Sequence, residues 1–217
     1  MHRLTQGLMQ GLMQDRSTRV LAIRHGETAW NVDTRMQGQL DIPLNERGLW
    51  QAQRVALALG DEALDAVYSS DLQRAHATAG ALAARAGLNV ISHPGLRERG
   101  FGIFEGQTYA EIAARWPEQA RRWHTRDPDF APEGGETLKA FHARCVQVAS
   151  SLCALHPGQS IALVAHGGVL DCLYRAATRA ALNAARSWQL GNASLNRLLY
   201  TDQGFTLVGW NDTSHFD

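Results

Sequence analysis

Three stretches of the chain share one pattern, in which a short apolar run ends in polar residues and leads into helical spacing. The apolar runs cover residues 20–23, 66–68 and 161–165. After the second run, Ser70 and Gln73 have the spacing of a capping box, which predicts the start of a helix. Short buried strands that alternate with helices are typical of a parallel sheet covered on both faces. The pattern therefore predicts an α/β fold, a three-layer α/β/α sandwich with a mostly parallel central sheet.

Further helices are expected from apolar residues that recur at helical spacing. One helix is predicted over 46–59, with an apolar stripe of Leu49, Ala52, Ala56 and Leu59. A second is predicted over 137–155, with a stripe of Leu138, Phe141, Cys145, Val148 and Leu152. Thr108 and Glu111 form another capping-box pattern, and Pro117 suits the first turn of the helix after that. Helices therefore follow or separate most of the predicted strands.

The remaining strands and the domain boundary complete this outline. A strand is predicted over 89–92, and two more in 193–211 on either side of a turn at 202–204. No linker composition interrupts the chain after residue 17, and its 217 residues suit one core. We therefore expect one domain over 18–217, preceded by a loose N-terminal tail over 1–17.

Composition and charge narrow the class of partner. Twenty-one basic residues balance twenty-one acidic ones, which argues against nucleic acid or an acidic membrane as the main partner. No apolar run approaches the length of a membrane span. The three cysteines form no C-x-x-C pair and are expected to be buried thiols in a reducing compartment. A cytoplasmic protein acting on a small molecule is the resulting expectation.

Basic side chains and histidines follow all three predicted strands. Arg24 and His25 end the first, Arg74 lies soon after the second, and His166 follows the third. Ligands of such sheets bind beyond the carboxyl ends of the strands, so we expect these four side chains to share one crevice if the strands are neighbours. Taken alone, Arg74 is more simply interpreted as a solvated surface residue.

The two histidines allow two kinds of chemistry. They could be metal ligands, but the adjacent Arg24 would repel a divalent cation, and no H-E-x-x-H motif is present. Cationic surroundings instead favour a neutral imidazole. A neutral imidazole can act as a nucleophile, with one ring nitrogen oriented by a backbone carbonyl. We therefore expect no metal at this site.

Five ordered sequence blocks resemble the histidine phosphatase superfamily, in its phosphoglycerate-mutase-like branch. They begin at Arg24 and reach Leu170, and they read RHGETAWN, SSDLQRAHATA, LRERGFGIFEG, PEGGET and VAHGGVL. The segment RMQGQLDIPLNERGLWQA after the first block and the C-terminal strands also fit the family. The resemblance implies the phosphoglycerate-mutase-like fold and a phosphoryl-transfer reaction.

The resemblance also implies roles for individual residues. His25 matches the nucleophile that takes the phosphoryl group, and Arg24, Arg74 and His166 match the residues that hold its oxygens. Glu98 matches the proton donor, which must be protonated when the ester oxygen leaves. The positions that match phosphate or substrate contacts are Asn31, Gln37, Gly38 and Gly167. Gly134, Gly135 and Glu136 match a motif of less direct role, and turn geometry alone could explain the glycines.

Members of this family are phosphatases or mutases, and the chain shows differences from the mutases. Phe101 stands where the bisphosphoglycerate-dependent mutases have a tyrosine, and Tyr109 falls about where they use a lysine. We therefore predict a metal-independent phosphomonoesterase that acts on a small phosphorylated metabolite through a phosphohistidine. A phosphoglycerate mutase-type phosphotransferase remains the alternative, and only that activity would require 2,3-bisphosphoglycerate as a cofactor.

A further alternative lies outside the enzymes. A non-catalytic phosphate-binding protein could keep the same fold, but it would be expected to lose one of the reactive side chains. The chain retains all of those expected, namely His25, Arg74, Glu98 and His166. For oligomeric state, a monomer and a homodimer both remain open.

Overall fold

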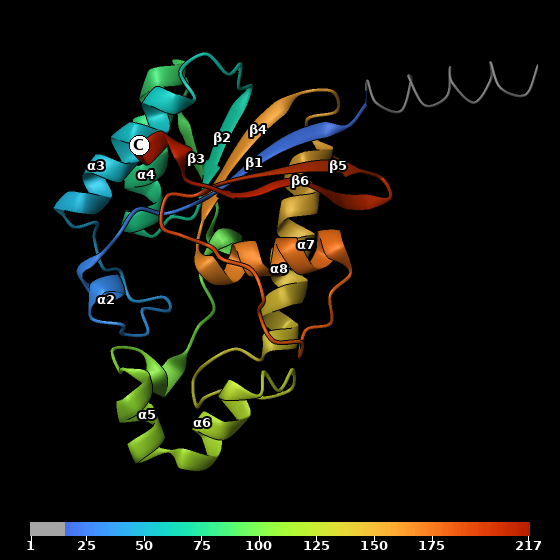
Figure 1. The fold of residues 1–217 in the computed structure, drawn as a ribbon. Helices are drawn as coiled ribbons and strands as arrows, with labels where there is room; N and C mark the ends of the chain where they lie inside the picture. The colour runs from blue at the N-terminus through green and yellow to red at the C-terminus, as the bar shows by residue number, and fades with distance from the viewer. Residues whose placement is uncertain (1–15) are drawn as a thin grey trace, which may run out of the picture.

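The computed structural model describes residues 16–217, so the predicted tail over 1–17 lies outside the described residues except for Arg16 and Ser17. A six-stranded sheet has the order β3-β2-β4-β1-β5-β6 (Figure 1). The first four strands in this order run parallel, and β5 and β6 are antiparallel to their neighbours, which confirms the mostly parallel sheet. The strands are β1 (Thr18–Arg24), β2 (Ala66–Ser69), β3 (Val90–Ser92), β4 (Ser160–Ala165), β5 (Leu195–Thr201) and β6 (Gly204–Asp212).

Helices cover both faces of the sheet, because successive residues of a strand point to opposite sides. In β1, Leu21 and Ile23 pack with α3 and α4, whereas Val20 and Ala22 belong to the cluster that includes α7 and α8. The predicted three-layer α/β/α sandwich is thus confirmed. The covering helices are α3 (Glu46–Ala58), α4 (Gln73–Ala86), α7 (Leu138–Ala154) and α8 (Gly167–Thr178).

A smaller group of helices stands apart from these layers (Figure 1). α5 (Tyr109–Arg115) and α6 (Pro117–His124) enclose an aromatic-rich core of their own, which contains Phe104, Ile112, Ala120 and Phe130. The predicted Thr108–Glu111 capping box is present, and Pro117 occupies the first turn of α6 as expected. The short remaining elements are α2 (Ala29–Val32), η1 (Pro94–Leu96), η2 (Gly102–Phe104) and η3 (Ser214–Phe216).

Two local predictions were wrong. Ser70 does not cap α4, which begins after Leu72, and the Leu72 side chain makes no capping hydrogen bond. The backbone N–H of Gln73 instead donates to the Asp41 carboxylate at 2.7 Å, so a distant loop supplies the acceptor that local spacing had assigned to Ser70. Leu49 is 53% exposed, because the buried face of α3 is centred on Val55 and leaves Leu49 at its rim.

The three cysteines are free thiols and all are buried, as the sequence predicts. Burial raises the pKa of the Cys153 thiol to about 12, which keeps it protonated and poorly reactive. Within residues 16–217, no helix is long and apolar enough to cross a membrane.

Candidate active site

The strands β2, β4 and β1 are neighbours, and their carboxyl ends align as expected. Arg24 pairs with Ala165 in the parallel ladder, so His25 and His166 leave the sheet at the same level. The centroids of the two imidazole rings are 5.2 Å apart. Arg74 is the second residue of α4, which follows β2. The side chains predicted to meet from three separate strand ends therefore lie together.

His25 is held as a neutral imidazole. Its ring is buried, and Nδ1 lies 2.7 Å from the carbonyl oxygen of Gly26, which can only accept a hydrogen bond. Nδ1 therefore carries the proton, which leaves Nε2 with the free lone pair. Burial lowers the pKa of His25 well below its ordinary value, and the charges of Arg74 and Arg24 lower it further. The carbonyl contact predicted for one ring nitrogen is present, and the lowered pKa agrees with the expected neutral form.

The lowered pKa predicts that His25 stays neutral in mild acid. At pH 5.5 an ordinary histidine with a pKa of about 6.5 is about 90% protonated, whereas His25 should remain mostly neutral with its proton on Nδ1. An NMR titration of the ring nitrogens measures both, and a His25→Ala spectrum assigns the signal. The same histidine in the urea-unfolded chain serves as reference. A midpoint in the folded protein at or above that reference would contradict the prediction.

Backbone carbonyls orient the two arginines, of which Arg74 is buried and Arg24 is half-buried. Arg24 donates from Nη1 to Leu190 O at 2.6 Å. Arg74 donates to Leu40 O at 2.8 Å and to Gly38 O at 2.7 Å. With 1% of its surface exposed, Arg74 is not the solvated surface residue that its sequence position alone suggested. Both guanidinium groups therefore have fixed positions beside the histidines.

Several nitrogens in this crevice are buried without partners. Within residues 16–217, neither Nε of Arg24 and Arg74 nor either ring nitrogen of His166 has a hydrogen-bond partner. Burial also lowers the pKa of Arg24, to about 10. Buried cations with unmet donors are costly unless an anion satisfies them. A phosphate group offers several acceptor oxygens and two negative charges, and it fits these donors.

The carboxylate of Glu98 lies against the first turn of α8. Its Oε2 accepts from the backbone N–H of Gly168 and its Oε1 from that of Arg99, each at 2.9 Å. A Cβ on residue 168 would lie 2.2 Å from Glu98 Oε1, so only glycine allows this approach. Burial lowers the pKa of Arg24 and of Arg74, and the negative charge of Glu98 raises both in the opposite direction. The carboxylate of Glu98 therefore lies near both guanidinium groups.

The PEGGET block supports the segment that carries Glu98. The Glu136 carboxylate accepts from Gly100 N at 2.8 Å and from Arg144 at 2.7 Å. Arg144 also donates to the carbonyl of Glu98 at 3.3 Å. A Cβ on Gly135 would lie 2.7 Å from Gly100 O, so this glycine serves a close backbone approach. The motif therefore positions the loop.

The expected substrate-contact residues surround the same crevice. Gly38 has a positive φ of 54° and supplies a carbonyl to Arg74, and Gln37 is buried beside it in the chain. A Cβ on Gly167 would lie 3.5 Å from Arg24 Nε, so the start of α8 adjoins that guanidinium. Thr28 is the N-cap of α2, and Asn31 completes the capping box with it. Asn31 also connects to His25 through Asn192.

Asn192 makes this connection, and no local sequence pattern indicated it. Its Nδ2 lies 3.1 Å from His25 O, 3.3 Å from Gly26 O and 3.2 Å from Asn31 Oδ1. The antiparallel pairing of Ile23 with Leu195 brings the residues before β5 to the carboxyl end of β1. A prediction of that antiparallel pairing would have pointed to Asn192.

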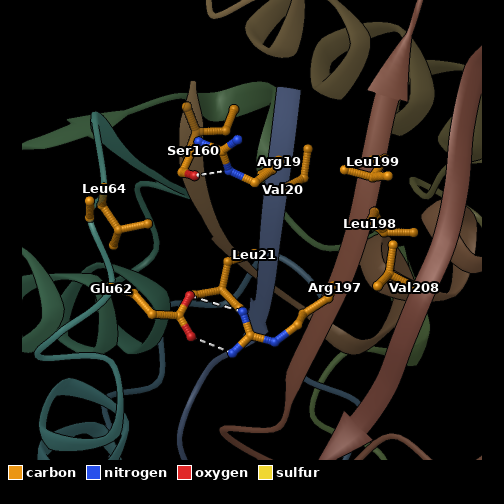
Figure 2. Close-up of a pocket in the computed structure, with 12 residues that line it drawn as sticks. Arg19, Val20, Leu21, Glu62, Leu64, Ser160, Arg197, Leu198, Leu199 and Val208 are labelled. Carbon is orange, nitrogen blue, oxygen red and sulfur yellow. Dashed lines mark hydrogen bonds and ion pairs between the residues drawn. The ribbon is translucent and has the colours of Figure 1, made fainter. Parts of the chain in front are cut away.

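A separate pocket of about 370 Å³ lies at the other end of β1 and β4 (Figure 2). Its polar side chains are paired: Arg19 donates to Ser160 Oγ at 2.6 Å, and Arg197 forms an ion pair with Glu62. The rest of the lining is mainly apolar, with Leu21, Leu64, Leu198, Leu199 and Val208 among its residues. The histidines lie at the opposite end of the strands, so this pocket is not the candidate active site.

Known proteins are similar to this chain in both sequence and fold. The pattern of the histidine phosphatase superfamily (branch 1) matches residues 20–213. "Phosphoglycerate mutase-like protein 4" of Arabidopsis thaliana is 38% identical, over 91% of this chain and 86% of the relative. "Metal-independent phosphoserine phosphatase" of the same plant is 37% identical, over 91% and 83%. A mycobacterial glucosyl-3-phosphoglycerate phosphatase solved with VO3 superposes with a TM-score of 0.80 at 36% identity, over 90% and 99%.

The chain therefore belongs to the histidine phosphatase superfamily, and the resemblance of its five motif blocks is confirmed. Phosphatases among the similar proteins bear out the expected class of enzyme, a phosphoric monoester hydrolase for small phosphorylated metabolites. Within residues 16–217, no group of three or more histidine, cysteine or acidic side chains is placed to hold a metal ion.

Proposed function

We propose that this protein is a metal-independent phosphomonoesterase whose reaction passes through a phosphohistidine at His25. The observation that carries the proposal is the neutral, buried His25 imidazole beside guanidinium and imidazole nitrogens that have no protein partner. Loose phosphoryl-transfer transition states need alignment and charge stabilisation. Arg24, Arg74 and His166 supply both for the equatorial oxygens, and the backbone N–H of Gly167 adds a donor at the helix start.

The first step transfers the phosphoryl group to the enzyme. Nε2 of His25 attacks phosphorus while the bond from phosphorus to the ester oxygen breaks, and the electron pair stays on that oxygen. Glu98, protonated in the substrate complex, gives the leaving oxygen its proton. The alcohol then departs.

The second step regenerates the enzyme. The Glu98 carboxylate takes a proton from a water molecule as the oxygen of that water attacks the phosphorus of phosphohistidine. The P–N bond breaks, its electron pair returns to Nε2 of His25, and inorganic phosphate leaves. Glu98 is again protonated, ready for the next ester. A carboxyl group fixed by two backbone N–H groups can serve both directions of proton transfer.

A mutase is the second candidate for the same site. Some similar proteins are named mutases or mutase-like, and the phosphohistidine could return its phosphoryl group to another hydroxyl instead of water. The substitutions Phe101 and Tyr109 in this chain favour hydrolysis. Two similar proteins are named for phosphoserine and glucosyl-3-phosphoglycerate, and a small phosphorylated metabolite is the substrate class we propose here.

Turnover in a chelator separates these possibilities. We expect the protein to release inorganic phosphate from a panel of phosphomonoesters, including 3-phosphoglycerate, at an undiminished rate with excess EDTA. Product identity is followed by NMR so that isomerisation is seen. Isomerised product without phosphate would favour the mutase, and activity lost with EDTA and restored by a divalent cation would contradict metal independence. Binding without either reaction would favour a non-catalytic phosphate-binding protein.

A further inference from the structure

Three arginines converge on one buried carboxylate near the candidate active site. Asp171 Oδ2 accepts from Arg126 Nη2 and from Arg175 Nε, each at 2.9 Å, and Asp171 Oδ1 accepts from Arg186 Nε at 3.0 Å. Asp171 is 3% exposed. One carboxylate balances one of the three guanidinium charges, so the cluster keeps an excess of two positive charges.

The three arginines differ in the donors that they have left. Arg175 is 1% exposed and donates also to the carbonyls of Ala181 and Ala184. Each of its three guanidinium nitrogens therefore has an acceptor within the protein. Arg126 uses Nε on Leu182 O at 3.0 Å. Among residues 16–217, Arg186 has Asp171 as its single hydrogen-bond partner, and its side chain is 38% exposed. Arg186 therefore has two free NH₂ groups, and Arg126 has one.

The cluster adjoins the phosphate crevice. Asp171 lies three residues after Gly168, about one helical turn or 5 Å along α8 from the N–H that holds Glu98. The segment after α8 leads back to the sheet (Figure 1). On that segment, Leu190 O accepts a hydrogen bond from Arg24. Burial is the main cause that lowers the pKa of Arg24, and the charge of Arg186 adds to it. The positive charges of Arg24 and Arg186 therefore repel each other.

We propose that Arg186 and Arg126 form a subsite for a second anionic group of the substrate, a carboxylate or a further phosphate. The inference rests on the proposed function, because the first phosphate must occupy the crevice at Arg24 and Arg74. Arg175 alone would neutralise Asp171, so the two additional guanidinium groups are not needed for the charge of that carboxylate. Asp171 instead holds the guanidinium groups of Arg126 and Arg186 in fixed orientations. Less conformational entropy is then lost when an anion binds to them.

The test compares substrates that differ only in the second charge. 3-Phosphoglycerate has a carboxylate where glycerol 3-phosphate has a hydroxymethyl group, and glycerol 1,3-bisphosphate has a second phosphate. We expect Arg186→Gln to lower kcat/KM for 3-phosphoglycerate roughly 10- to 100-fold, mainly through KM, since hydrogen bonds to charged groups are the strong ones. Glycerol 3-phosphate should change less than about 2-fold, because it makes no such bond. The bisphosphate arm shows which anion the subsite prefers.

Matched variants control for charge and for folding. Arg85→Gln removes the same charge from an exposed position on α4 and should leave the substrate ratio unchanged. Arg186→Lys keeps the charge without the fork and should recover part of the loss. Arg126→Gln should shift the ratio in the same direction, with thermal unfolding measured alongside because Arg126 also holds Leu182. Equal losses on all three substrates, or no change on any, would overturn the subsite.

Binding distinguishes a failure of this inference from a failure of the proposed function. Calorimetry measures the affinity of the wild type and of Arg186→Gln for 3-phosphoglycerate and glycerol 3-phosphate, with or without turnover. Tighter binding of 3-phosphoglycerate that Arg186→Gln abolishes supports the subsite even if no phosphate is released, an outcome that would refute the phosphatase alone. A wild type that binds both compounds equally overturns the subsite, whatever its activity.

Discussion

Replacing His25 with alanine should abolish phosphate release while the fold survives. The side chain supplies the nucleophile, so we expect kcat to fall by roughly 10³-fold or more, with residual turnover from direct attack by water. The guanidinium groups of Arg24 and Arg74 remain in His25→Ala, held by backbone carbonyls that the substitution does not touch. Affinity for inorganic phosphate should therefore persist. Steady-state phosphate release and calorimetry measure the two quantities separately.

His76→Ala is the matched control, because His76 is exposed on α4 and contributes nothing to the crevice. It should keep wild-type turnover. Rapid quenching in alkali, which preserves phosphohistidine, should trap a phosphoryl group on His25 in the wild type and none in His25→Ala. Full activity of His25→Ala would refute the mechanism, and a phosphoryl group on His166 would reassign the nucleophile.

The position of the site could be predicted because its residues directly follow strands. Short apolar runs identified β1, β2 and β4, and the rule that ligands bind beyond the carboxyl ends of parallel strands placed His25, Arg74 and His166 together. The prediction required these three strands to be neighbours, which the sequence did not show, and the order β2-β4-β1 satisfies that requirement. The sequence also predicted a neutral His25 from the adjacent Arg24, but burial is the larger cause of its lowered pKa, and burial is a property of the folded chain.

Contacts between segments distant in sequence could not be predicted in this way. Asn192 reaches His25 because β5 runs antiparallel to β1, and nothing in the local pattern of residues 193–211 specified that partner. Gln73 found its acceptor in Asp41, from a loop 32 residues away. Arg74 looked like a surface residue, because the carbonyls of Gly38 and Leu40 that accept from it lie more than thirty residues away in the sequence. Local rules fail where a tertiary contact supplies a better partner.

Exchanging Glu98 for glutamine should have the second largest effect, and its size should depend on the leaving group. An alkoxide needs a proton as it departs, so Glu98→Gln should slow hydrolysis of glycerol 3-phosphate by about 10²- to 10⁴-fold. Nitrophenolate leaves without help, so nitrophenyl phosphate should be cleaved to phosphohistidine at nearly the wild-type rate. Single-turnover measurements isolate that step from the later hydrolysis, which also needs Glu98.

The carboxylate also has a structural role that the control must separate. Glutamine keeps one acceptor oxygen, and its NH₂ group would face the N–H of either Gly168 or Arg99, which costs about 1–3 kcal/mol for the unpaired buried donor. Thermal unfolding measures that cost, and Glu118→Gln on the exposed face of α6 gives the reference for a lost surface carboxylate. A purely structural Glu98 would slow both esters equally, because a displaced loop does not distinguish leaving groups. Only a proton donor makes the loss grow with the basicity of the departing oxygen.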